Sequence, residues 1–226
     1  ITLTPLHNSK IYLGGYYGKY KNLIDSAWLN EKSIGVFKGN RKLTPGIYFI
    51  VSSEKKILFE ILIDSAQHFS IVADTATNQP FVKGSEENQL FFAYTKFLEQ
   101  HVPTLMALQQ QLSSAKTQED SLRIQKKLKD TNAQLVQYRE HIIQTKPQSL
   151  LSLFFIAMKK PESPANISSE QAFYFIKEHY WDDVPFYDDR LLHTPFFDAK
   201  LEEYFQHYVS PHPDSIIAEI NYMLLS

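Results

Sequence analysis

The first eighty residues alternate short apolar runs with turn-forming residues. Six of these runs are rich in β-branched and aromatic side chains, which is typical of strands. They are KIYLGGYY (10–17), LIDSAWLN (23–30), IGVFKG (34–39), GIYFIVS (46–52), KILFEILID (56–64) and HFSIVAD (68–74). Because no helical pattern separates them, they predict an antiparallel β-sandwich-like domain, with an open barrel as the alternative.

The run at 46–52 is apolar on both of its faces. Ile47 and Phe49 lie on one face, whereas Tyr48 and Ile50 lie on the other. Successive side chains of a strand point to opposite faces of the sheet. We therefore expect one face to cover the β core and the other to contact the rest of the chain.

Beyond residue 84 the apolar period changes from two residues to three and four. The first series is Phe91, Tyr94, Leu98, His101, Leu105, Leu108 and Leu112, and the second is Ile124, Leu128, Thr131, Leu135, Tyr138 and Ile142. Each series places one apolar seam along a helix. The polar link SSAKTQED (113–120) joins the two, so the pattern predicts an antiparallel hairpin over 86–145, with Ser85 at its start.

The remaining residues predict a small all-helical region. Pro147 ends the hairpin, and QSLLSLFFIAMKK (148–160) is apolar on all sides, which indicates a buried helix. Three more helices are expected to begin at Ser168 or Ser169, at Asp198 and at Pro213-Asp214. The whole pattern predicts an α+β fold with an antiparallel β-domain at 1–84 and a helical domain at 85–226, the latter made of a hairpin (86–145) and a helical bundle (148–226).

Charge and composition exclude some function classes. The net charge is −2 with no sustained Lys or Arg run, which argues against binding to nucleic acid or to an anionic membrane surface. No apolar run is long enough to span a bilayer, so no membrane span is expected. The absence of Cys removes disulfides, thiolate nucleophiles and Cys-ligated metals from these residues. The start ITLTPLHNSK lacks signal-peptide features, so we expect a mature or trimmed fragment.

Two short motifs have simple structural interpretations. GGYYGKY (14–20) superficially resembles a phosphate-binding loop, but Leu13 and Tyr20 occupy positions where that motif needs Gly and Ser or Thr. We expect a β-turn there. NIS (166–168) matches a glycosylation acceptor, and a loop that begins a helix explains it equally well. No nucleotide or other cofactor is predicted.

The stretch YWDDVPFYDDRLLHTPFFDAK (180–200) is the strongest candidate for chemistry. Its carboxylates are Asp182, Asp183, Asp188, Asp189 and Asp198, and they surround His193. Such side chains can bind Ca²⁺, Mg²⁺ or Zn²⁺, which makes Asp188, Asp189 and His193 candidate metal ligands. The stretch contains no Gly for an EF-hand loop, and its His spacing does not match a zinc-binding helix.

A structural role explains more of these residues. Asp is favoured at turns and helix N-caps, where its carboxylate accepts from nearby backbone N–H groups. Arg190 can pair with Asp188 or Asp189, and Thr194-Pro195 is expected to form an extended turn before a helix at Asp198. This interpretation is preferred. A partner-binding surface and a metal or acid/base site remain as alternatives, and no catalytic residue is assigned.

Several motifs in order resemble a known protein family. They are Asp25-Ser26-Ala27, Phe37-Lys38-Gly39, Pro45-Gly46-Ile47-Tyr48 and Gly84-Ser85-Glu86-Glu87-Asn88, followed by HYWDDVPFYDDRLLHTPFFDAKLEEYF (179–205). This order resembles the N-terminal region of Bacteroidetes envelope proteins related to thioredoxin, in which a β-domain and a helical domain, both of unknown function, precede a thioredoxin-like domain. The resemblance covers nearly the whole chain.

The resemblance implies a location in the cell envelope, periplasmic or lipid-anchored, and a downstream domain whose Cys-x-x-Cys pair exchanges thiols and disulfides. Because this chain has no Cys, no catalytic residue is carried over. The first hypothesis is a non-catalytic accessory module of a thiol-disulfide oxidoreductase. The alternatives are a stand-alone envelope module that binds a glycan or peptide in an aromatic groove between the β and helical parts and, as a minority view, a metal-dependent hydrolase. The helical hairpin is the expected surface for any homodimer.

Overall fold

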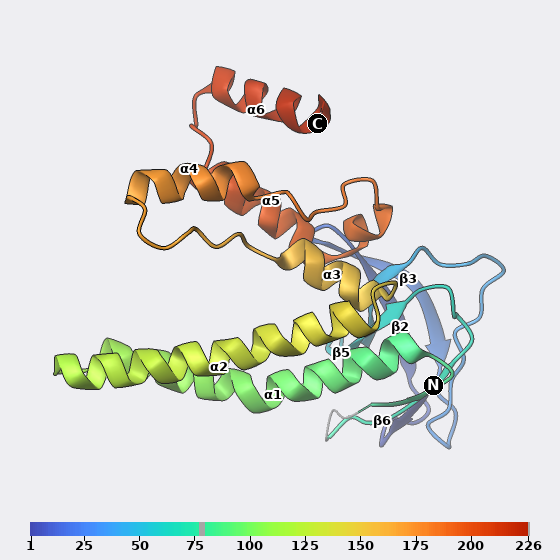
Figure 1. The fold of residues 1–226 in the computed structure, drawn as a ribbon. Coiled ribbons are helices and arrows are strands. Elements are labelled where there is room, and N and C mark those ends of the chain that lie inside the picture. Colours follow the sequence, from blue (N-terminus) through green and yellow to red (C-terminus); the bar gives the residue numbers. More distant parts are fainter. Residues whose placement is uncertain (77–79, 226) are drawn as a thin grey trace.

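The computed structural model describes residues 1–76 and 80–225. Within these residues, seven strands in two sheets precede six α-helices and one short 3₁₀ helix (Figure 1), so the predicted α+β class is confirmed. None of the described helices combines the length and the apolar character needed to cross a membrane.

The larger sheet has four antiparallel strands in the order β3-β2-β4-β5. Their bounds are β2 (Lys10–Tyr17), β3 (Tyr20–Trp28), β4 (Gly46–Val51) and β5 (Ile57–Ile63). Its two faces belong to different cores, as the alternation in β4 predicted. Tyr48 and Ile50 pack between the sheets, whereas Ile47 and Phe49 pack against the helices.

The smaller sheet corrects the expectation of purely antiparallel pairing. It consists of β1 (Thr2–Thr4), β6 (Ser70–Asp74) and β7 (Phe81–Lys83), and β1 runs parallel to β6. Parallel strands need a long connection. The whole larger sheet lies between β1 and β6 in the chain and supplies that connection. The three-residue strands β1 and β7 are too short to give a recognisable alternation, so the sequence did not predict them.

The predicted strand at 34–39 is wrong. Its only sheet-like contact is an isolated antiparallel bridge between Ile34 and Thr2. The Gly35 N–H donates to the Ile1 carbonyl at 2.9 Å, and the terminal amine of Ile1 donates to Gly35 at 2.8 Å. Beyond this anchor, residues 36–43 continue without regular secondary structure.

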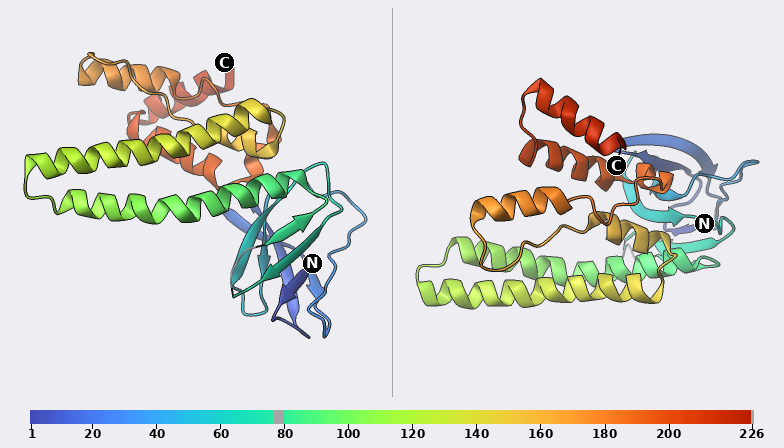
Figure 2. Two further views of the ribbon diagram at one scale, coloured as in Figure 1. Left: turned by 60° about the horizontal axis from the view of Figure 1, so that its bottom comes forward. Right: turned by 45° about the horizontal axis from the view of Figure 1, so that its top comes forward.

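The helices follow the predicted order. Their bounds are α1 (Glu86–Ser113), α2 (Gln118–Thr145), α3 (Leu150–Met158), α4 (Ser169–His179), η1 (Asp189–His193), α5 (Pro195–His207) and α6 (Pro213–Leu225). Ser85 caps α1 and Ser168 caps α4, the latter in a capping box with Gln171. The paired helices α1 and α2 confirm the hairpin, whose far half extends away from the sheets (Figure 2).

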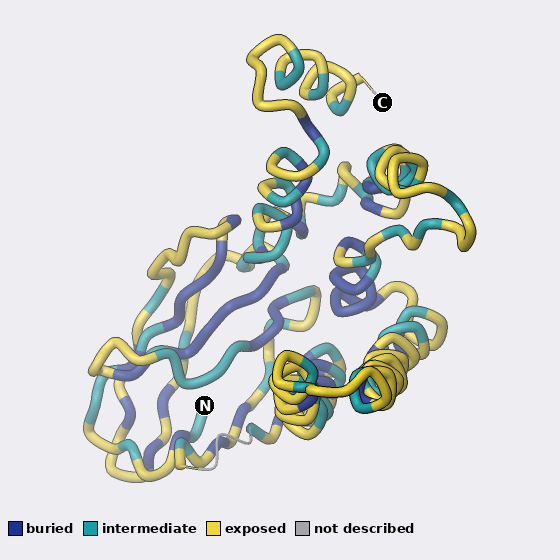
Figure 3. Tube along the Cα trace, turned by 90° about the vertical axis from the view of Figure 1, so that its left-hand side faces the viewer, coloured by how far each residue is buried: buried dark blue, intermediate teal, exposed yellow. Residues whose placement is uncertain are grey.

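A single core joins the larger sheet to α1, α2 and α3. It contains Phe49 and Leu62 from the sheet and most of α3, of which seven of nine residues are buried. Figure 3 shows that buried residues concentrate in the strands and α3, whereas α4 and α6 are largely exposed. The segment 148–160 is therefore the buried helix that its composition predicted. The 84/85 boundary coincides with the junction of β7 and α1, and the division into two domains stays a prediction.

Helix α5 begins three residues before the predicted start. Pro195 occupies its first turn, and the Asp198 carboxylate accepts from the backbone N–H of Lys19 at 2.9 Å instead of capping the helix. The contact joins α5 to the β2–β3 turn, where Gly18 has a φ of +52° and donates its N–H to Leu192 at 2.7 Å. A Cβ at Gly18 would clash with Asp198. The Gly-Lys pair is thus the predicted β-turn, and it docks the larger sheet onto the helices.

Candidate binding cleft

The acidic stretch does not form one cluster in the folded chain. Asp188 caps η1 by accepting from the Arg190 N–H at 3.1 Å, and the Arg190 guanidinium donates to its carboxylate at 2.7 Å. This neighbour lowers the pKa of the Asp188 carboxyl. Asp189 is exposed on the first turn of η1. The capping role and the Arg190 pair that the sequence predicted are confirmed for Asp188.

His193 lies at the end of η1, against the larger sheet. Its Nδ1 is 3.2 Å from the Tyr16 carbonyl, and its Cβ lies where a side chain on Gly46 would be. The ring also contacts the edge of Tyr17. The three candidate metal ligands therefore have separate surroundings. Across residues 1–76 and 80–225 no three Asp, Glu or His side chains gather closely enough to hold a metal ion.

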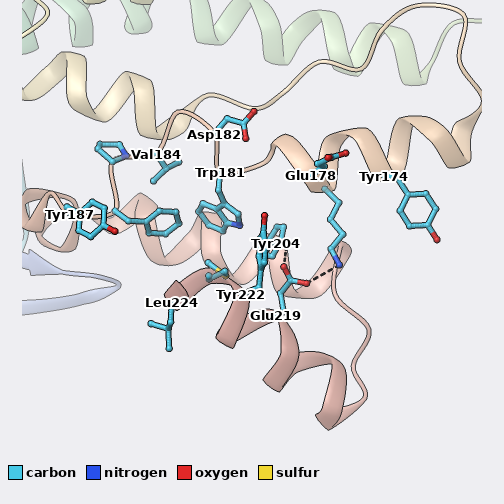
Figure 4. A pocket seen from close by; sticks show the side chains of 14 residues that line it. Tyr174, Glu178, Trp181, Asp182, Val184, Tyr187, Tyr204, Glu219, Tyr222 and Leu224 are labelled. Atoms are coloured by element: carbon cyan, nitrogen blue, oxygen red, sulfur yellow. Dashed lines mark hydrogen bonds and ion pairs between the residues drawn. The ribbon is translucent and has the colours of Figure 1, made fainter. Parts of the chain in front are cut away.

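The same stretch does line a cleft of about 860 Å³ in the helical region (Figure 4). Helix α4, residues 181–187, one residue of α5 and the last turns of α6 form its walls. The lining residues are Tyr174, Lys177, Glu178, Trp181, Asp182, Val184, Pro185, Phe186, Tyr187, Tyr204, Glu219, Tyr222, Met223 and Leu224. Its size falls within the range of small-molecule and peptide-side-chain sites.

Packed rings form the base of the cleft. The Trp181 ring lies 5.2 Å from Tyr204 and 5.3 Å from Phe186. The Tyr180 ring packs against Trp181 and against Tyr204, each at 5.0 Å. Tyr180 and Tyr204 are almost completely buried, which fixes the base in place. Tyr187, by contrast, stands at the edge of the cleft and is 95% exposed. The cleft thus combines a rigid aromatic base with an open aromatic edge.

One ion-pair network ties α6 to the rest of the cleft. The Tyr204 hydroxyl donates to Glu219 Oε1 at 2.6 Å, and Lys177 Nζ lies 3.0 Å from Glu219 Oε2. Burial and the Glu219 carboxylate raise the pKa of Tyr204, so its hydroxyl stays a hydrogen-bond donor. Glu178 and Asp182 are exposed carboxylates on the walls, and Asp182 Oδ2 lies 2.6 Å from His179 Nδ1.

Lys200 lies directly behind the aromatic base. Its Nζ donates to the Lys159 carbonyl at 2.6 Å and lies 5.0 Å from the Tyr180 ring centre and 5.5 Å from that of Trp181. Burial lowers the pKa of Lys200 to about 8. The ammonium therefore supports the rings and the end of α3 from inside.

The candidate residues from the sequence and the residues that line the cleft come from the same stretch but differ. Attention to carboxylates favoured Asp188 and Asp189, whereas Trp181, Phe186 and Tyr187 line the cleft. The available signal was the density of aromatic residues between 173 and 187. The α6 residues gave no such signal, because only the fold brings α6 next to α4.

Comparison with known protein families gives a match to the second half of the chain. A family model described as Domain of unknown function (DUF5106) matches residues 106–226, a range that includes every residue lining the cleft. No curated protein and no solved structure gave a significant match. Because the family model covers more than half of the sequence, this chain belongs to the DUF5106 family.

Proposed function

We propose that this chain is a non-catalytic binding module that holds a peptide segment in the aromatic cleft. The observation that carries the proposal is the cleft itself, with its rigid base at Trp181 and Tyr204 and its exposed edge at Tyr187. Rigid aromatic side chains give a large contact area at a low cost in conformational entropy. An aromatic groove was predicted between the β and helical parts, and the cleft lies within the helical part instead.

A peptide fits the walls better than a glycan does. Val184, Met223 and Leu224 add aliphatic surface beside the rings, which suits apolar side chains. Glu178 and Asp182 offer carboxylates at the rim that can accept from peptide N–H groups or from a basic side chain. We therefore infer a segment with bulky apolar residues next to a Lys or Arg.

We also propose that this module belongs to an envelope protein, beside a thioredoxin-like domain. There it would supply substrate specificity to a thiol-disulfide oxidoreductase. This part of the proposal rests on the motif resemblance described under Sequence analysis. The lack of Cys in these 226 residues supports a non-catalytic part for them. Reading the coding sequence beyond Ser226 for a Cys-x-x-Cys motif tests this context, and reduction of insulin disulfides by the purified chain would contradict the non-catalytic assignment.

Array binding tests the cleft directly. The full chain is applied to a peptide array that varies apolar and basic residues, and to a glycan array. We expect peptide hits that Tyr187→Ala weakens at least about fivefold, because an exposed interface aromatic is typically worth about 1 kcal/mol or more. Tyr20→Ala at the start of β3 is the matched control, since Tyr20 is a 63% exposed Tyr that does not line the cleft. Glycan hits alone, or equal loss in both variants, would overturn the proposal.

A further inference from the structure

A second cavity, of about 680 Å³, lies inside the β region beneath residues 36–43. It is separate from the aromatic cleft and lies outside the range matched by the family model. Its inner wall is aliphatic and comes from both sheets. The apolar lining residues are Ile1, Leu13, Val36, Phe37, Leu43, Ile50, Ile61, Ile63, Phe69 and Ile71. A cavity with this lining favours a hydrocarbon chain over a polar ligand.

The mouth of this cavity is basic. Lys38, Arg41 and Lys42 all lie on the segment that crosses it, and all three are exposed. In the part of the chain that the structure describes, none of them forms an ion pair with a carboxylate. Asp25 is the acidic residue of the lining, and its Oδ1 accepts from the Ser26 N–H at 2.6 Å. The mouth therefore has an excess of unpaired positive charge.

The crossing segment is held at both ends. Gln67 accepts from the Leu43 N–H and donates to the Leu43 carbonyl, both at 2.8 Å, and it also donates to Asp64 at 3.0 Å. At the other end, Gly35 and Ile1 exchange two backbone hydrogen bonds. These anchors hold both ends of the segment that carries the three cations.

We propose that this cavity binds a fatty acid, with its hydrocarbon chain along the apolar lining and its carboxylate at Lys38, Arg41 and Lys42. Each methylene that leaves water for the apolar lining is favourable, which provides affinity for the chain. The guanidinium of Arg41 can donate two parallel hydrogen bonds to a carboxylate, which provides selectivity for the charged end. The apolar lining and the cationic mouth together match an amphiphile with a single chain and an anionic head group. They disfavour an amphiphile whose head group is neutral or cationic.

Calorimetric titration of the full chain with laurate, below the concentration at which laurate self-associates, tests the site. We expect saturable binding of one laurate per chain. Dodecanol and dodecyltrimethylammonium have the same chain and lack the negative charge, so each should bind at least about tenfold more weakly. Laurate that binds no more tightly than dodecanol, or with no saturation, would overturn the proposal.

Three variants localise the binding. Arg41→Gln with Lys42→Gln should weaken laurate at least about tenfold, while Lys126→Gln with Lys127→Gln makes the same charge change on the exposed face of α2 and should leave binding unchanged. Ser65→Trp places a large ring at the exposed rim without altering the core and should abolish binding. Equal effects of the two charge variants, or full binding by Ser65→Trp, would contradict this location.

Discussion

The inner helices α1 to α3 and the outer helices α4 to α6 pack around apolar clusters of different size. Seven of nine residues of α3 are buried, whereas α4 and α6, every residue of which the structure describes, contain no buried residue. The inner helices share an apolar core with the larger sheet. The outer helices share a smaller apolar cluster around Tyr180, Tyr204 and Val209, and the Glu219 network adds to it. Apolar burial dominates folding stability, so the inner layer should carry the stability while the outer layer leaves aromatic surface free to bind.

The largest expected effect lies at Asn88, where the inner layer meets the sheet edge. Asn88 is fully buried, and its side chain accepts from the Leu62 N–H at 2.8 Å and donates to the Leu62 carbonyl at 2.6 Å. The Asn88 amide therefore pairs with the edge of β5 as the backbone of a neighbouring strand would. Asn88→Ala leaves both backbone groups buried without partners and should reduce the free energy of unfolding by about 2 to 5 kcal/mol, measured by urea denaturation.

Gln89→Ala is the control for this change, because Gln89 is the next residue of the same helix and is exposed. It should change the free energy of unfolding by less than about 0.5 kcal/mol. Similar values for the two variants would show that the sheet edge does not depend on Asn88, and the contrast between the layers would lose its main support.

An intermediate effect is expected at Lys200, which joins the layers by donating to the end of α3 beneath Tyr180. Burial lowers its pKa from 10.5 to about 8 in the folded chain. Between these pH values the unfolded chain binds a proton that the folded chain lacks, so raising the pH stabilises the fold. We expect the free energy of unfolding to rise by about 1 to 3 kcal/mol over this range relative to Lys200→Met.

Urea denaturation at a series of pH values measures this difference. Subtracting the Lys200→Met data removes most of the contribution of the tyrosines, which also ionise near the upper end of the range. Lys126→Met, at an exposed position of α2, should keep the wild-type pH dependence. If the free energy of unfolding changed with pH in the same way for the wild type and for Lys200→Met, Lys200 would be solvated and would not join the layers.

The smallest global effect is expected at Glu219. Glu219→Ala removes the acceptor for Tyr204 and Lys177, so α6 should detach while the inner core stays intact. We expect faster hydrogen exchange across 213–225 and a change of less than about 1 kcal/mol in the free energy of global unfolding. Asn221→Ala, an exposed residue of α6, should leave the exchange unchanged. A large loss of global stability would show that the outer layer folds as one unit with the inner layer.

Local patterns determined most of the secondary structure from the sequence alone. The apolar seams of 91–112 and 124–142 reappear as the packed faces of α1 and α2, since Phe91, Tyr94 and Leu108 are buried on one helix and Ile124, Leu135 and Ile142 on the other. Ser85 and Ser168 were recognisable as caps because capping depends on residues within one turn. Five of the six predicted strands also form, because alternation is a local signal as well.

Only the tertiary structure decided how distant segments meet. Three contacts join residues far apart in the chain: β1 pairs in parallel with β6, Asp198 docks on the β2–β3 turn, and α4 meets α6. Their geometry depends on how all the intervening residues pack. For the same reason the carboxylates of 182–198 are close in sequence but separate in space. Asp188 caps η1, Asp198 contacts the β2–β3 turn and Asp182 lines the cleft. A sequence lists which groups are near one another along the chain, whereas a binding site needs them near one another in space.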